Sequence, residues 1–141
     1  MALIGKPKSV GNWRKSGGAF ELTVTMEGTG SATAYIVDDK LYVDCAAAQN
    51  AKHIGLTIPF DLKVVDQVNI LDGTTSSTVQ AYNGTDQVMT VTATGTTEGA
   101  MKRATVCDTT YWAFSSGDTD LYLEVTTAAF TGVVILDILP Q

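Results

Sequence analysis

The sequence predicts an all-β fold, either an antiparallel β-sandwich or a barrel-like domain. Three observations predict it. Apolar and polar residues alternate with period two in several segments, and turn-forming residues recur at intervals of roughly ten residues. In addition, 21 of the 141 residues are threonine, a β-branched residue that suits an exposed pleated face.

The composition excludes several other classes of protein. With 45% apolar and 17% charged residues, the chain is too apolar for intrinsic disorder, and its few glutamates exclude a long coiled coil. No apolar run approaches the roughly 18 residues of a membrane span, so no membrane partner is expected. The first residues lack the apolar stretch of a secretory signal, and we expect synthesis and retention in the cytoplasm unless the protein leaves within a particle.

An extended basic arm is predicted over residues 1–18, ahead of a single β domain over 19–141. The arm is rich in Gly, lacks periodicity and contains no acidic residue, although the net charge of the chain is -6. Such asymmetry often marks an arm that docks on an acidic neighbour, and a solvated terminus is the alternative. Its tryptophan has little to pack against within the arm, which favours an anchor on a partner. The predicted partner-binding residues are Lys6, Lys8, Trp13, Arg14 and Lys15.

Alternation and turn chemistry predict the strands of the domain. Asn83 and Gly84 give the strongest hairpin signal, because a type I′ turn needs positive φ at both central residues. The continuous apolar run 133–136 predicts a strand that is covered on both faces, and the Ala-rich segment 45–52 is the only helix candidate. Strands are expected at 20–26, 32–37, 41–45, 53–60, 62–70, 77–82, 89–94, 104–114, 121–126 and 132–138.

No arrangement of residues predicts catalysis, a cofactor or a metal. His53 is the only histidine and falls on the polar side of its strand, where a solvated imidazole is expected. Asp118 and Asp120 offer two carboxylates for Ca²⁺ but lack further oxygen ligands, so a turn is the preferred interpretation. Cys45 and Cys107 fit neither a metal motif nor a disulfide framework; free thiols are preferred and a bridge between them stays open.

An aromatic cluster at 110–114 has two interpretations. Trp112 and Phe114 share strand parity, which favours a place in the core. Exposure of Tyr111 or Trp112 would instead indicate a stacking surface for sugars. The core is the preferred interpretation.

Taken together, the Gly- and Lys-containing arm, the Thr-rich β domain, the single histidine and the apolar end Leu139-Pro140-Gln141 resemble the small structural proteins of tailed-bacteriophage virions. Among these, the chain looks most like capsid decoration (cement) proteins. The resemblance implies a non-enzymatic β domain, often a homotrimer, that sits on the outer capsid surface of the virion and clamps neighbouring copies of the major capsid protein.

Other functions remain as alternatives. A tail-tube subunit or another virion component would share the same features, and a carbohydrate-binding or adhesion module is a third possibility. Nucleic acid is not an expected partner, because the arm has only four cations and the acidic body would repel phosphates.

Overall fold

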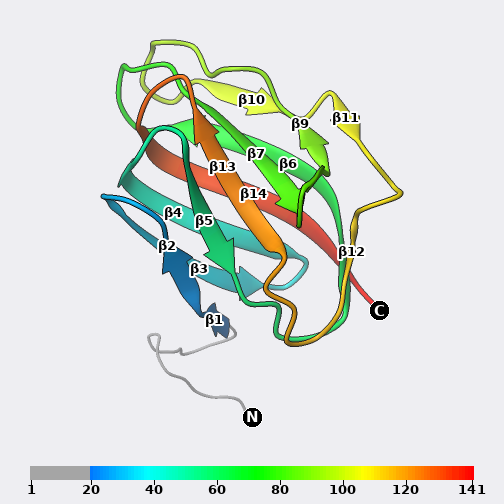
Figure 1. Ribbon diagram of the computed structural model, residues 1–141. Coiled ribbons are helices and arrows are strands. Elements are labelled where there is room, and N and C mark those ends of the chain that lie inside the picture. Colours follow the sequence, from blue (N-terminus) through cyan, green and yellow to red (C-terminus); the bar gives the residue numbers. More distant parts are fainter. Residues whose placement is uncertain (1–19) are drawn as a thin grey trace.

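The computed structural model describes residues 20–141, which form β-strands and loops with no helix in that range. Two antiparallel sheets lie face to face and do not close into a barrel (Figure 1). The all-β class is therefore confirmed, and of the two predicted architectures the sandwich is the one found.

The larger sheet, called sheet A, has the last of its strands in sequence at its centre. This strand, β14 (Phe130–Pro140), pairs with β4 (Lys40–Ala48) on one side and with β6 (Leu62–Leu71) on the other. The strand order is β1-β3-β4-β14-β6-β10, and β12 also pairs with β6. The other strands are β1 (Phe20–Leu22), β3 (Ser31–Val37), β10 (Met101–Arg103) and β12 (Ala113–Phe114).

The smaller sheet, called sheet B, covers one face of sheet A and has the strand order β2-β5-β13-β7-β8 (Figure 1). A separate two-stranded sheet joins β9 (Met89–Thr90) to β11 (Val106–Cys107). The strands of sheet B are β2 (Val24–Met26), β5 (Lys52–Leu56), β7 (Thr78–Asn83), β8 (Asp86–Gln87) and β13 (Leu121–Thr126).

The core lies between the two sheets and follows the predicted alternation. In β13, the three side chains of one parity are buried and the three of the other parity are half-exposed, as the pattern at 121–126 predicts. Burying one large apolar side chain contributes about 1.5–3 kcal/mol, so such residues supply most of the stabilising free energy. The largest buried apolar side chains are Phe130, Leu41, Ile54, Leu56, Ile58, Leu62, Met89, Leu121, Leu123 and Leu136.

The strand predicted over 20–26 is divided between the two sheets. β1 pairs with β3 in sheet A, whereas β2 pairs with β5 in sheet B, and Thr23 lies at the crossing. The carbonyl of Thr23 accepts a hydrogen bond from the backbone N–H of Thr57 at 3.1 Å. Because both sheets share one core, the alternation continues across the break and does not reveal it.

The helix predicted over 45–52 is wrong. β4 continues through Ala48, and a turn at Asn50 and Ala51 leads into β5. An isolated helix of this length is marginal, whereas pairing with β3 and β14 satisfies the backbone of β4 and buries Cys45 and Ala48. Tertiary pairing therefore overrides the helical propensity of alanine.

The strand predicted over 104–114 is wrong over most of its length. Only β11 and β12 form within it, and a turn at 109–111 separates them. The Asp108 carboxylate accepts the backbone N–H of Thr110 at 2.9 Å, a local bond that favours a turn over a strand. The strand predicted over 89–94 likewise ends at Thr90; Thr94 is buried, and its hydroxyl accepts the N–H of Ser77 at 3.1 Å.

The hairpin predicted at Asn83 and Gly84 forms with its turn shifted by one residue. Asn83 pairs with Asp86, which leaves Gly84, at a φ of 64°, and Thr85 as the two central residues. The Asn83 side chain instead donates a hydrogen bond to the carbonyl of Tyr111 at 2.8 Å. The asparagine therefore anchors a neighbouring loop.

Gly132 lies in the central strand of sheet A, opposite a bulge in β4. Here one residue of β14 opposes two residues of β4, because the register shifts between Phe130 and Gly132. Gly132 has a φ of 155°, and a Cβ at this position would lie 2.1 Å from the carbonyl oxygen of Ile70 and 2.8 Å from Cζ of Phe130. The close backbone approach therefore requires glycine.

Two buried amide side chains on β6 bind the backbone of β7 across the core. Gln67 and Asn69, each 0% exposed, both donate a hydrogen bond to the carbonyl of Val79 at 2.8 Å. Gln67 also donates to Oδ1 of Asn69 at 2.8 Å and accepts the N–H of Ala81 at 3.2 Å. β8 pairs only with the last two residues of β7. The side chains of Gln67 and Asn69 therefore give the β7 backbone hydrogen-bond partners that a longer β8 would otherwise provide.

Candidate functional site

The predicted partner-binding arm lies outside the described residues. Lys6, Lys8, Trp13, Arg14 and Lys15 all precede Phe20, at which β1 begins. Their role and the domain boundary at 18/19 therefore stay predictions. The arm joins the described domain at β1, an edge strand of sheet A.

The side of sheet A that faces away from sheet B carries two neighbouring rows of apolar side chains. We call it the outer face of sheet A. Strand register places the members of each row side by side, and no further layer of strands covers them among residues 20–141. A contiguous apolar surface of this kind marks interaction sites in proteins. The first row is Tyr35, Tyr42, Ile135 and Val68, and the second is Val133, Ile70 and the 61% exposed Met101.

Two stacked tyrosines form one end of the first row. The rings of Tyr35 and Tyr42 lie 5.4 Å apart between centroids at an interplanar angle of 15°. Burial raises the pKa of Tyr35, and the neighbouring Asp44 carboxylate raises it further. The Tyr35 phenol therefore stays neutral at physiological pH. Tyrosine is also a side chain enriched at protein interfaces.

Charged pairs border the apolar rows. Lys40 Nζ lies 2.8 Å from Oδ1 of Asp137, and Arg103 forms an ion pair with Asp66. By register and parity, these side chains point to the same side as the apolar rows. An apolar centre with a charged rim is the usual composition of a protein–protein interface.

The apolar run 133–136 is covered on one face only, within the described residues. Val134 and Leu136 are fully buried between the sheets, as predicted. Val133 and Ile135 are half-buried and point to the outer face of sheet A, so the predicted second cover is not found among residues 20–141. The centre of that face is therefore apolar and has no described layer over it.

The aromatic cluster at 110–114 is divided between core and surface. Phe114 is buried, whereas Tyr111 and Trp112 are half-buried against the edge of the core. Lys63 Nζ lies 5.0 Å from the ring centroid of Trp112, a cation–π contact that occupies part of the exposed indole. The core position predicted from alternation is therefore confirmed for Phe114, whereas Trp112 is only partly buried.

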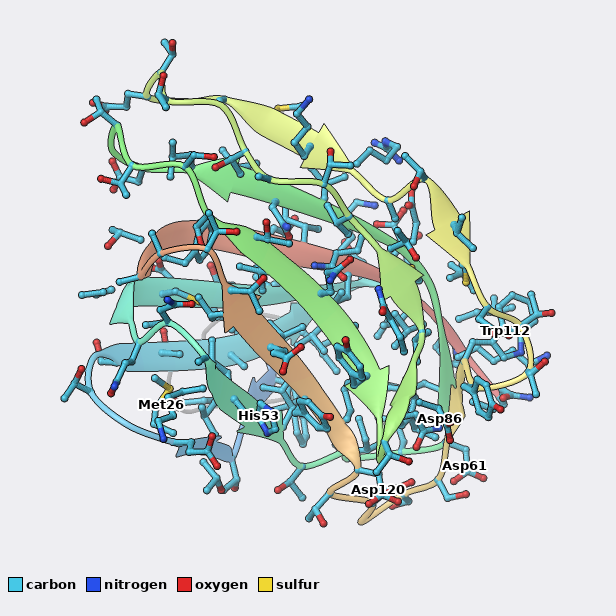
Figure 2. All side chains as sticks on the ribbon, turned by 45° about the horizontal axis from the view of Figure 1, so that its top comes forward. Met26, His53, Asp61, Asp86, Trp112 and Asp120 are labelled. Atoms are coloured by element: carbon cyan, nitrogen blue, oxygen red, sulfur yellow. The ribbon has the colours of Figure 1, made fainter. Side chains whose placement is uncertain are left out.

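His53 points outward from sheet B, as predicted, but its ring is stacked rather than freely solvated. It lies 4.1 Å from the ring of Tyr122, which in turn lies 5.2 Å from the ring of Tyr82. His53 Nε2 is 3.6 Å from Oε2 of Glu124. Burial, followed by the Glu124 charge, raises the pKa of both tyrosines. Figure 2 shows His53 far from Trp112, so the two aromatic groups form separate sites.

The carboxylates of Asp118 and Asp120 form the turn that the sequence predicts. Asp118 Oδ1 accepts the backbone N–H of Asp120 at 2.8 Å. Charge repulsion from Asp118 raises the pKa of Asp120. Within residues 20–141, no group of three or more His, Cys, Asp or Glu side chains is placed to hold a metal ion.

Both cysteines are free. Cys45 is buried in the core, and Cys107 is half-buried, with its Sγ 3.7 Å from the carbonyl oxygen of Val64. Of the two predicted states, the structure has the free thiols. Burial raises the pKa of Cys45 to about 12, and burial also raises the pKa of Cys107. Cys107 is the more accessible of the two thiols, because it is only half-buried.

A thiol reagent such as 5,5′-dithiobis(2-nitrobenzoate) should distinguish the two cysteines. At pH 8, we expect only Cys107 to react in the folded protein, because the thiolate is the reactive form and Cys45 remains protonated and enclosed. Both thiols should react in urea. The Cys107→Ser variant should therefore show no reaction until it unfolds, and rapid reaction of that folded variant would contradict the buried position of Cys45.

Comparisons with known proteins give no relative: no family model, curated protein or solved structure matches this chain. In the part of the chain from Phe20 onward, no helix with the length and apolarity of a membrane span is present.

Proposed function

We propose that the protein is a non-enzymatic structural protein of a tailed-bacteriophage virion, of the capsid decoration kind. In this proposal the outer face of sheet A docks on the major capsid protein. The observation that supports it is the outward half of the apolar run in β14. Val133 and Ile135 lie at the centre of that face, with no described layer over them.

The outer face has the properties that a clamp between subunits requires. A stable interface buries about 800 Å² on each partner, and the area buried contributes about 25 cal/mol per Å² before the costs of association are subtracted. A sheet supported on its other side by a packed core loses little conformational entropy on docking. A trimer would present three such faces in a fixed relation, and the basic arm would add a second contact on an acidic neighbour.

The Ile135→Lys variant tests the docking face. A lysine at the centre of the interface should weaken co-sedimentation with capsids built from the major capsid protein by roughly 30-fold, or about 2 kcal/mol, as for other central interface residues. The matched control is Thr126→Lys, which places the same charge on the outward side of sheet B. It should bind like the wild-type protein.

Two results would contradict the proposal. Full capsid binding by Ile135→Lys would remove the outer face of sheet A from the interaction. Light scattering provides the other measurement, since a trimer agrees with a decoration protein whereas a six-fold ring or a polymer would favour a tail tube.

A further inference from the structure

A groove lies on the outward side of sheet B, beside the ring of His53. It has a volume of about 400 Å³ and is open to solvent. This volume falls within the range of small-ligand sites, about 300–1,000 Å³. Its walls come from β2, β5, β13 and the loop before β13. The lining side chains include Thr25, Glu27, His53, Thr119 and Tyr122.

The groove exists because Gly55 lacks a side chain. Gly55 pairs with Thr25 of β2 on one side and with Tyr122 of β13 on the other, so it lies in the middle of the outward surface of sheet B. At most positions of this surface a side chain fills the space above the strand. At Gly55 the space stays open between the two neighbours.

The fold does not require glycine at this position. The backbone of Gly55 is not in the left-handed region, and a Cβ would meet its nearest atoms, the carbonyl oxygen and Cβ of Thr25, at 3.4 and 3.6 Å. These are ordinary contacts. Glycine within a strand costs about 0.5–1 kcal/mol relative to alanine. A glycine inside a strand marks a bulge, a tight bend or the close approach of a ligand or another backbone, and the strand register shows no bulge at Gly55.

The side chains around Gly55 select a class of ligand. The hydroxyls of Thr25 and Thr119 and the carboxylate of Glu27 can pair with ligand hydroxyls, and the rings of His53 and Tyr122 offer apolar contact. Glu27 Oε1 accepts the backbone N–H of His53 at 3.3 Å, which holds the carboxylate at the groove.

Charge also restricts the ligand. Among the described residues that line the groove there is no Lys or Arg, and Glu124 stands next to His53. Negative charge without a compensating cation disfavours phosphates and acidic sugars. Hydroxyls, one carboxylate and aromatic edges together fit a neutral polyhydroxylated ring.

We infer that the groove at Gly55 binds a neutral glycan, with a sugar ring seated over Gly55 between Thr25 and the stacked rings of His53 and Tyr122. This site is distinct from the aromatic cluster at 110–114. It also lies on the opposite face of the sandwich from the proposed capsid-docking surface. The two proposals can therefore fail independently.

NMR of the full chain tests the inference directly, because His53 is the only histidine and its ring signals report on the groove. Maltotriose and chitotriose, titrated separately, are the probes. We expect at least one of them to shift the His53 signals saturably, with a millimolar dissociation constant. Gly55→Val should weaken that binding at least tenfold because it fills the groove.

The controls keep the result interpretable. Gly95→Val is the matched variant, since a Cβ at Gly95 meets only Ala100 Cβ at 3.6 Å and Gly95 does not line the groove. It should bind like the wild-type protein. If Gly55→Val fails to fold, Gly55→Ala and Thr119→Val replace it. The inference is overturned if neither trisaccharide shifts the His53 signals, or if folded groove variants bind as tightly as the wild-type chain.

Discussion

Replacing Gly132 with alanine should lower the free energy of unfolding by about 4 kcal/mol, an amount that combines overpacking with strain at an unfavourable φ. The added Cβ would lie 2.1 Å from the carbonyl oxygen of Ile70, and that oxygen belongs to the backbone of β6 and cannot rotate away. Gly132 lies where β14 pairs with both β4 and β6, so a shift there would disturb both strand pairs.

Gly73→Ala provides the control for this prediction. Gly73 also has a positive φ, 140°, but a Cβ there would have no atom within 4 Å. This variant therefore carries the conformational cost alone and should lose about 1 kcal/mol. Urea unfolding of both variants, followed by tryptophan fluorescence, measures the difference. Equal losses would show that the contact with Ile70 relaxes easily.

The Gln67→Leu substitution should destabilise the protein by about 3 kcal/mol. It removes one of the two side-chain donors found for the carbonyl of Val79 among residues 20–141, and it removes the side-chain acceptor of the Ala81 N–H. It also leaves Oδ1 of Asn69 without the donor that Gln67 supplies. All these groups lie in the core, where an unsatisfied polar group costs about 1–3 kcal/mol. The leucine has a similar volume, so lost packing contributes little.

An outward amide serves as the comparison for Gln67. Gln87 donates hydrogen bonds to Oε1 of Gln80 at 2.9 Å and to the carbonyl of Met89 at 2.8 Å, but it is half-exposed. Water can replace these bonds, so Gln87→Leu should cost less than about 1 kcal/mol. If the two leucine variants unfold at the same urea concentration, the buried amides do not hold the sheets together as described.

The sequence predicted the strands better than their arrangement. The alternation of apolar and polar residues identifies which side chains share a face of a strand. For 121–126 it predicted correctly both the bounds of the strand and which side chains are buried. It carries no information about which sheet a strand joins, and the crossing at Thr23 was therefore missed. The segment 45–52 was wrongly predicted to be a helix because its strand conformation depends on pairing with β3 and with β14. The sequence does not show these pairings, and β14 is also distant along the chain.

The candidate sites depended even more on long-range pairing. Parity placed His53 and Tyr122 on outward surfaces, but their contact follows from the order β5-β13-β7. The run 133–136 predicted a strand covered on both faces, and the sequence could not show that Val133 and Ile135 would have no described layer over them. Gly55 was visible as a glycine inside an alternating segment, a signal that points to close approach by another molecule.

The central position of β14 has a consequence for synthesis on the ribosome. β14 follows every other strand of sheet A in the sequence, yet it separates β4 from β6. A nascent chain that has not yet released residues 130–140 therefore holds two half-sheets whose inner edges lack a partner. Unpaired edges are sites of aggregation, and pairing between distant segments is slow. The growing chain is thus most in need of a chaperone just before β14 emerges, when nearly all of the core residues have already been made.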